Sequence, residues 1–405
     1  MREADRVFLK ILSSALHGRP AMIGSNLRRK TWREIIHLSA KHRVLPMIIQ
    51  ASWEADSDNE SIIHPFLERA KELTFNQAQR TADFLILYTF LADRGFRPVI
   101  LKGAIVRDMY PYPEQRPSID EDLLIGPEEI DELHAALLDF GLALEGDEDY
   151  KTSQEIAYRD RQRGLYIEVH RELFSTDSDA YSECNSLFEG VLGRTIDTFI
   201  YGVPVRTLAP TDHLLYLICH AYKHFLYGGV GIRQICDICI MAEKWNEGID
   251  WEKVRNKCET IHILKYAAGL FRIGERYLEC QMPDIFKDIS VNPDPLLEDV
   301  LTGGLYGVSD INRAHSAIMT LNAVAADRAG KKKKGVVNSI FLPLRSMSSK
   351  YLYLRKFPFL LPIAWLQRVV GYISELRHQR HVDFSRTIQI GRKRIDLLRE
   401  YDIIR

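Results

Sequence analysis

Hydrophobic residues recur with helical spacing through most of the first 95 positions. Apolar side chains repeat every three to four residues in three stretches, at 8–16, 32–49 and 62–94, and this is the period of one face of an amphipathic helix. Gly95 directly follows the third stretch, and a glycine in that position commonly ends a helix. The pattern therefore predicts an N-terminal helical region over residues 1–95, with one helix for each stretch.

The pattern changes after residue 95 from helical spacing to short apolar or alternating runs. Such runs are typical of strands, and they lie at residues 99–101, 121–125, 142–145, 156–160 and 165–170. A helix is expected between the second and third runs, because Pro127 precedes two acidic residues that favour a helix N-terminus and Gly141 ends the pattern. Residues 96–172 are thus expected to form a compact α/β unit.

Helical spacing returns after Pro210. The expected helices cover residues 211–226, 232–245, 250–260 and 263–278. We expect a helical substrate- and nucleotide-binding region over residues 173–290 and a C-terminal helical region over residues 291–405. The predicted fold class is α+β, with a small mixed β-sheet core embedded in a predominantly α-helical protein.

Composition limits the classes of partner and compartment. The chain carries 54 basic and 55 acidic residues, a net charge of −1, so its overall charge does not favour nucleic acid. No transmembrane segment is expected, because two prolines, Gln367 and Arg368 interrupt the most apolar stretch, 357–373. The N-terminus lacks the apolar core of a signal peptide, and six dispersed cysteines do not form a disulfide framework. We expect a cytoplasmic protein.

Two aspartates at the start of the second predicted strand carry the main chemical signal. Side chains alternate between the faces of a strand, so Asp120 and Asp122 point to the same side, about 6–7 Å apart along the backbone. That arrangement suits carboxylates that hold Mg²⁺ or Mn²⁺ for two-metal phosphoryl transfer. Taken alone, such a pair is more often a solvated turn, so the interpretation depends on its neighbours.

A third carboxylate is expected on the same side. In the run 165–170, Ile167 and Val169 share one face while Tyr166, Glu168 and His170 share the other. If the apolar face packs on the core, Glu168 faces the aspartates. We assign it as a metal ligand or as the general base for an attacking hydroxyl.

Positively charged and glycine residues near the aspartates are candidates for nucleotide binding. Gly103 follows a predicted buried strand, where it allows backbone N–H groups to approach a phosphate at a helix start. Lys102 can add a point charge to the triphosphate, and Arg116 can bind it with a forked geometry. Together these residues form the order strand, glycine, helix, paired aspartates, strand, helix, hairpin and glutamate.

This order resembles the uncharacterised nucleotidyltransferase family 5, within the DNA polymerase β-like nucleotidyltransferase superfamily. The similar segments are 101–104 (LKGA), 116–125 (RPSIDEDLLI), 166–170 (YIEVH), 220–224 (HAYKH), 232–237 (IRQICD) and 249–251 (IDW). The resemblance covers roughly residues 30–285. It implies a small mixed sheet with helices on one side and metal-dependent transfer of a nucleoside monophosphate from a nucleoside triphosphate (NTP).

Two positions depart from the superfamily pattern. The superfamily usually has a Gly-Ser pair in the first loop, whereas this chain has Gly103 followed by alanine, and Ser118 is the hydroxyl that could replace the serine. The residue between the aspartates is usually apolar, whereas here it is Glu121. Because Glu121 points away from the metals and into the core, it needs a partner, an edge position or a distorted strand.

The helical region offers residues that could line a cleft opposite the sheet. His213, His220 and His224 fall on one helical face, but their spacing is too long for all three to bind one ion. We expect His220 and His224, together with His170 on the strand, to line the cleft.

Other polar features of the helical regions have simpler interpretations as well. Arg233 and Asp237 lie one turn apart and form either an ion pair or part of the cleft. Cys236 and Cys239 have redox or zinc spacing without a second ligand pair, so buried helical cysteines are expected. The lysines at 331–334 indicate a solvated loop, and the basic, aromatic segment 350–359 indicates a helical element packed on the body.

The leading hypothesis is a metal-dependent nucleotidyltransferase that acts on an NTP and a hydroxyl-bearing acceptor, either a small molecule, a protein side chain or an RNA end. The alternative is a catalytically degenerate nucleotide-binding or antitoxin-like regulatory protein that acts through a protein partner. A third hypothesis, an RNA-modifying enzyme that uses the basic C-terminal region, requires binding that weakens steeply with salt.

Overall fold

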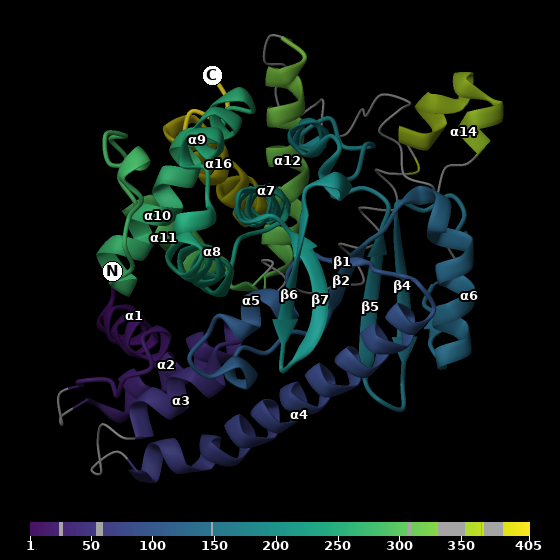
Figure 1. The fold of residues 1–405 in the computed structure, drawn as a ribbon. Helices are drawn as coiled ribbons and strands as arrows, with labels where there is room; N and C mark the ends of the chain where they lie inside the picture. The colour runs from purple at the N-terminus through teal and green to yellow at the C-terminus, as the bar shows by residue number, and fades with distance from the viewer. Residues whose placement is uncertain are drawn as a thin grey trace.

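The computed structural model describes residues 1–23, 27–53, 60–146, 149–305, 310–330, 353–365, 367 and 384–405. One seven-stranded mixed sheet lies at the centre, with the strand order β3-β4-β5-β2-β1-β7-β6 (Figure 1). Its strands are β1 (Val99–Ile100), β2 (Glu121–Leu124), β3 (Ala143–Leu144), β4 (Glu155–Asp160), β5 (Leu165–His170), β6 (Thr195–Ile200) and β7 (Val203–Leu208). The α+β fold class is confirmed.

The sheet extends beyond the α/β unit that the sequence predicts. Residues 96–172 supply five strands, and β6 and β7 add a further hairpin, with β7 parallel to β1. This hairpin escaped prediction because Pro204 interrupts β7 and because β6 is an edge strand without regular alternation. The centre of the sheet is β5-β2-β1, where β2 is parallel to β5 and antiparallel to β1.

Four helices precede the sheet: α1 (Glu3–Leu16), α2 (Arg29–Lys41), α3 (Leu45–Trp53) and α4 (Glu60–Asp93). The single helix predicted over 32–49 is wrong, because the chain breaks between α2 and α3 at Arg43, which has a φ of 53°. Helix α4 packs along the sheet on β5 and β7 (Figure 1). It ends before Gly95, whose φ of 90° agrees with the predicted stop.

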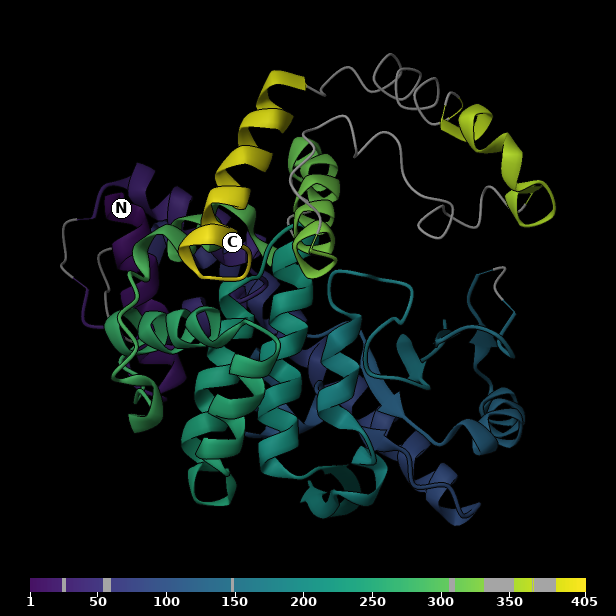
Figure 2. The ribbon, with the colours of Figure 1, turned by 90° about the horizontal axis from the view of Figure 1, so that it is seen from above.

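The other helices of the described residues are α5 and α6, which lie between strands of the sheet, and the helices that follow β7. They are α5 (Ala104–Asp108), α6 (Ile130–Phe140), α7 (Pro210–Tyr227), α8 (Ile232–Lys244), α9 (Trp251–Thr260), α10 (Leu264–Leu278), α11 (Asp294–Gly303), α12 (Ile311–Arg328), α14 (Tyr353–Lys356) and α16 (Phe384–Glu400). Helix α16 packs on α12, and the two lie side by side in both views (Figures 1 and 2).

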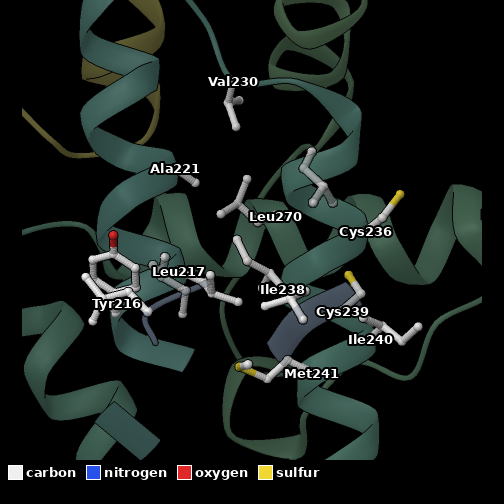
Figure 3. Close-up of a cluster of buried hydrophobic side chains, with 14 of the residues drawn as sticks. Tyr216, Leu217, Ala221, Val230, Cys236, Ile238, Cys239, Ile240, Met241 and Leu270 are labelled. Atoms are coloured by element: carbon white, nitrogen blue, oxygen red, sulfur yellow. The ribbon is translucent and has the colours of Figure 1, made fainter. Parts of the chain in front are cut away.

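Helices α7, α8 and α10 share a hydrophobic core. Leu217 of α7, Ile238 of α8 and Leu270 of α10 meet between the three helices (Figure 3). Cys236 and Cys239 belong to the same buried set, and all six cysteines are buried and unbridged, as expected for helical core cysteines. This core fixes the spacing of α7 and α8, which both carry residues of the candidate site.

The expectations for a membrane-spanning helix and for the basic C-terminal segments can be compared with the described residues. Within the described ranges, no helix is long and apolar enough to cross a membrane. The lysines at 331–334 lie outside the described residues, as do residues 350–352 of the basic, aromatic segment. In the described part of that segment, Phe357 and Phe359 are exposed rather than packed on the body.

A buried ion pair anchors β2 to the helix that follows β1. Glu121 is buried, and its carboxylate accepts hydrogen bonds from the Ala104 N–H (2.8 Å) and from the Arg107 guanidinium. Arg107 is buried as well, and it also donates to the Ser118 hydroxyl (2.8 Å). The partner that Glu121 requires is therefore Arg107 of α5.

We predict that Glu121→Leu lowers the free energy of unfolding by about 3–5 kcal/mol, because it leaves the Arg107 guanidinium buried without its counter-charge. Glu121→Leu combined with Arg107→Met removes both charges and should recover most of that loss. Urea denaturation of the two variants measures the difference. A double variant no more stable than the single one would contradict a buried pair.

Candidate functional site

The predicted carboxylates lie together on one face of the sheet. Asp122 and Glu168 are direct partners in the parallel pairing of β2 with β5, and Asp120 lies two residues before Asp122 on the same face. One ligand atom each from Asp122, Glu168 and His170 lie within 4.8 Å of one another. This is the one such cluster of potential metal ligands in the part of the chain that the structure describes.

His170 orients one of these carboxylates. Its Nε2 lies 3.0 Å from Asp122 Oδ1, and its Nδ1 lies 3.8 Å from Glu155 Oε2. With the Nε2 proton donated to Oδ1, the second oxygen of Asp122 is directed away from His170. That oxygen, Oδ2, is buried and has no hydrogen bond from any described residue, although the Lys102 ammonium lies 3.1 Å away.

Lys102 lies between the two aspartates. Its Nζ is 3.2 Å from Asp120 Oδ2 and 3.1 Å from Asp122 Oδ2, and its side chain is 13 % exposed. Burial by itself raises the pKa of Asp120, but the charges of Lys102 and Arg233 bring that pKa well below its usual range. The carboxylate of Asp120 is therefore ionised whenever the protein is folded at neutral pH.

Two histidines of α7 extend this hydrogen-bonded group. Lys102 Nζ is 3.3 Å from His220 Nε2, which is in turn 3.1 Å from His224 Nε2. Burial, and after it the charge of Lys102, lowers the pKa of both imidazoles well below the usual range, so both are neutral. The ammonium can only donate, so His220 Nε2 accepts and the proton of His220 lies on Nδ1.

The third histidine of the predicted face lies elsewhere. His213 is fully buried, its Nδ1 lies 3.1 Å from the Thr207 hydroxyl, and burial lowers its pKa to about 3. It belongs to the core between α7 and β7. His220 lines the pocket beside Asp120, and His224 contacts His220, whereas His213 does neither.

Glu168 has an unusual protonation behaviour. Burial, followed by the negative charges of Asp122 and Glu155, raises its pKa to about 8. Three carboxylates thus share a small region with a single lysine. A divalent cation in this region would relieve the repulsion among them.

The two sequence-predicted residues Arg116 and Asp237 form a buried ion pair. Arg116 Nε and Nη2 donate to the Asp237 carboxylate at 2.8 and 2.6 Å, and the Tyr110 hydroxyl donates to the same group at 2.7 Å. Burial raises the pKa of Asp237, but pairing with Arg116 brings it below its usual value. Asp237 thus pairs with Arg116, and Arg233 donates to the Pro117 carbonyl.

A pocket opens beside Asp120, and Glu168 is not among its lining residues. It encloses about 420 Å³, part of it open to solvent, and its lining includes Lys102, Gly103, Arg116, Ser118, Asp120, His220, Arg233, Gln234 and Asp237. Three of these side chains are cationic. Two more are the carboxylates of Asp120 and Asp237, and Lys102 connects the pocket to Asp122.

Gly103 and Ser118 have structural duties at the pocket wall. Gly103 has a φ of 49°, and a Cβ there would lie 1.9 Å from Glu121 Oε2, so only glycine fits. The Ala104 N–H after it is bonded to Glu121, which occupies a donor that the sequence suggested for phosphate. The Ser118 hydroxyl accepts from Arg107, so it is not freely available either.

The sequence did not predict several residues that hold the loop before β2, which contains Ser118. Gln77 and Arg80 of α4 bind the main-chain N–H and carbonyl of Ser118, both at 2.7 Å, and Tyr110 and Arg107 act as described above. The single available signal was the requirement that Glu121 find a partner. The polar positions of a long helix give no indication of which loop they meet.

Comparison with known proteins identifies the family of the chain. A family model described as an uncharacterised nucleotidyltransferase matches residues 28–279, which is more than half of the chain and includes all the site residues above. Neither the curated proteins nor the solved structures gave a match. The chain belongs to the uncharacterised nucleotidyltransferase family.

Proposed function

We propose that this protein transfers a nucleoside monophosphate from an NTP to a hydroxyl-bearing acceptor, with Mg²⁺ or Mn²⁺ held by Asp120, Asp122 and Glu168. The observation that carries the proposal is the juxtaposition of these three carboxylates, on one face of β2 and β5, with the cationic pocket of Lys102, Arg116 and Arg233.

The carboxylate cluster fits a hard divalent cation. Asp122 Oδ2 is a buried carboxylate oxygen that receives no hydrogen bond within the described chain, and Glu168 has a raised pKa because Asp122 and Glu155 crowd it in a buried setting. Oxygen ligands are those that Mg²⁺ and Mn²⁺ prefer. When bound, the metal would polarise the reacting phosphate and neutralise its developing charge.

The pocket beside Asp120 suits the phosphate chain of the NTP. Lys102 and Arg233 supply charge, and the bidentate pairing of Arg116 with Asp237 fixes the arginine in one rotamer. The charged lining of the pocket suits phosphates rather than a nucleoside. The nucleoside would then extend out of the pocket.

Transfer forms a bond from the acceptor oxygen to the α-phosphorus and breaks the bond to pyrophosphate, in line. The proton of the acceptor hydroxyl goes to solvent or to Glu168, which serves as the base only when it is ionised and not itself bound to the metal. The negative charge on pyrophosphate is met by Arg116 and Arg233. The acceptor therefore approaches from the Glu168 side.

A second candidate is a nucleotide-binding relative that does not transfer and acts through a protein partner. It is favoured by the Ala104 N–H and the Ser118 hydroxyl, which are both engaged within the protein. Incubation of the protein with each of the four NTPs and a metabolite extract, followed by mass spectrometry for an added monophosphate and by a pyrophosphate assay, separates the two functions. Nucleotide binding without pyrophosphate release would support the second candidate.

We predict that Asp120→Asn combined with Asp122→Asn abolishes both turnover and the Mn²⁺-dependent rise in melting temperature, because both ionised ligands are lost. Asp139→Asn is the matched control, since Asp139 is exposed and pairs with Arg94 on the surface. Differential scanning fluorimetry with and without Mn²⁺ gives the readout. An unchanged Mn²⁺ response in the double variant would exclude these aspartates as ligands.

Arg233→Met should weaken NTP binding by about 10- to 100-fold, the usual cost of one charge-assisted hydrogen bond. Isothermal titration calorimetry with Mg²⁺ and each NTP measures the loss, and Arg233→Lys should recover only part of it because lysine lacks the forked geometry. If Arg233→Met binds every nucleotide as tightly as the parent protein, Arg233 does not contact phosphate.

A further inference from the structure

We infer that Lys102 is an exchangeable counter-ion that makes metal binding depend on the nucleotide. The inference rests on the proposed function, because it concerns the order in which that site fills. In this inference Lys102 controls metal binding in addition to contacting phosphate. The ammonium occupies the cation position between the two aspartates until a triphosphate draws it away.

The position of the ammonium carries the inference. Nζ lies at nearly equal distances, 3.2 and 3.1 Å, from the Oδ2 atoms of Asp120 and Asp122. A metal bound by these same two oxygens would lie close to Nζ, and two cations in a partly buried region repel strongly. The ammonium and the metal therefore compete for one pair of ligands.

The second location for Lys102 is the adjoining pocket. Lys102 lines that pocket together with Arg116 and Arg233, so a small rotation of its flexible side chain turns the ammonium toward a phosphate there. His220 Nε2, 3.3 Å from Nζ, gives the ammonium a neutral acceptor on the pocket side. The lysine can thus leave the aspartates without losing all its partners.

Linkage makes the consequence reciprocal. If the nucleotide removes Lys102 from the aspartates, it raises the affinity for metal, and bound metal must raise the affinity for nucleotide by the same factor. We therefore expect weak binding of metal alone and strong mutual enhancement of metal and nucleotide. Removal of the ammonium should reduce that enhancement to the part that comes from direct contact between metal and phosphate.

The first expectation, weak binding of metal alone, is tested by titrating the full chain with Mn²⁺. Electron paramagnetic resonance of the free ion measures the binding. Lys102→Met, which has similar length and no charge, should bind Mn²⁺ at least about fivefold more tightly than the parent protein. Lys102→Arg keeps the charge and should bind as weakly as the parent. Lys223→Met removes a charge from α7 that forms no ion pair with Asp120 or Asp122, and it should also leave Mn²⁺ binding unchanged.

The second expectation, mutual enhancement of metal and nucleotide, is tested with the α,β-methylene analogues of the four NTPs, which bind without transfer. In the parent protein and in Lys102→Arg, the melting temperature should rise more with Mn²⁺ and analogue together than the two separate rises predict, whereas in Lys102→Met this excess should be clearly smaller. Equal or weaker Mn²⁺ binding by Lys102→Met than by the parent overturns the inference alone. If the parent binds Mn²⁺ neither alone nor with any analogue, the proposed function fails as well.

Discussion

The site depends on the alternation of side chains along β2. Glu121 points to one face, where Arg107 and the Ala104 N–H bind its carboxylate, so Asp120 and Asp122 must emerge on the other face beside Glu168. A slip of one residue would turn the two aspartates toward Arg107 and turn Glu121, which anchors α5, toward Glu168. The residue that departs most from the expected pattern of the superfamily is thus the one that fixes the orientation of its neighbours. Glu121 is compatible with an intact carboxylate site for that reason.

The sequence predicted the features that follow from local periodicity. The helices, the five strands within 96–172 and the shared face of Asp122 and Glu168 all follow from the repeats of 3.6 and 2 residues. The break at Arg43 and the hairpin of β6 and β7 were missed, since a left-handed residue and an edge strand with a proline leave little trace in a hydrophobic pattern. Contacts between distant segments were also invisible. Arg116 and Asp237 were both singled out, but their pairing across 121 positions emerges only once α8 is placed against the loop before β2.

The electrostatics of the site are divided in space. Asp122, Glu168 and Glu155 lie close together, while Arg116 and Arg233 line the pocket with Asp120 and Asp237, and Lys102 contacts both aspartates of β2 and His220 of α7. Helices α7 and α8, which share the hydrophobic core of Figure 3, hold the cationic side at a fixed distance from the sheet. A polyanionic substrate that carries a cation matches such a division. An uncharged substrate would interact with neither the carboxylates nor the arginines of the pocket.

The pairing of Arg116 with Asp237 has a consequence for the entropy of ligand binding. Two nitrogens of the guanidinium are held by the carboxylate, and the third, Nη1, is buried with no hydrogen bond from the described parts of the chain. An arginine on an open surface loses rotamer freedom when it captures an anion, at a cost of about 0.5–1.5 kcal/mol. Arg116 has already lost that freedom during folding, when Asp237 and Tyr110 closed around it. An anion that reaches Nη1 therefore meets a donor whose ordering was completed before the encounter.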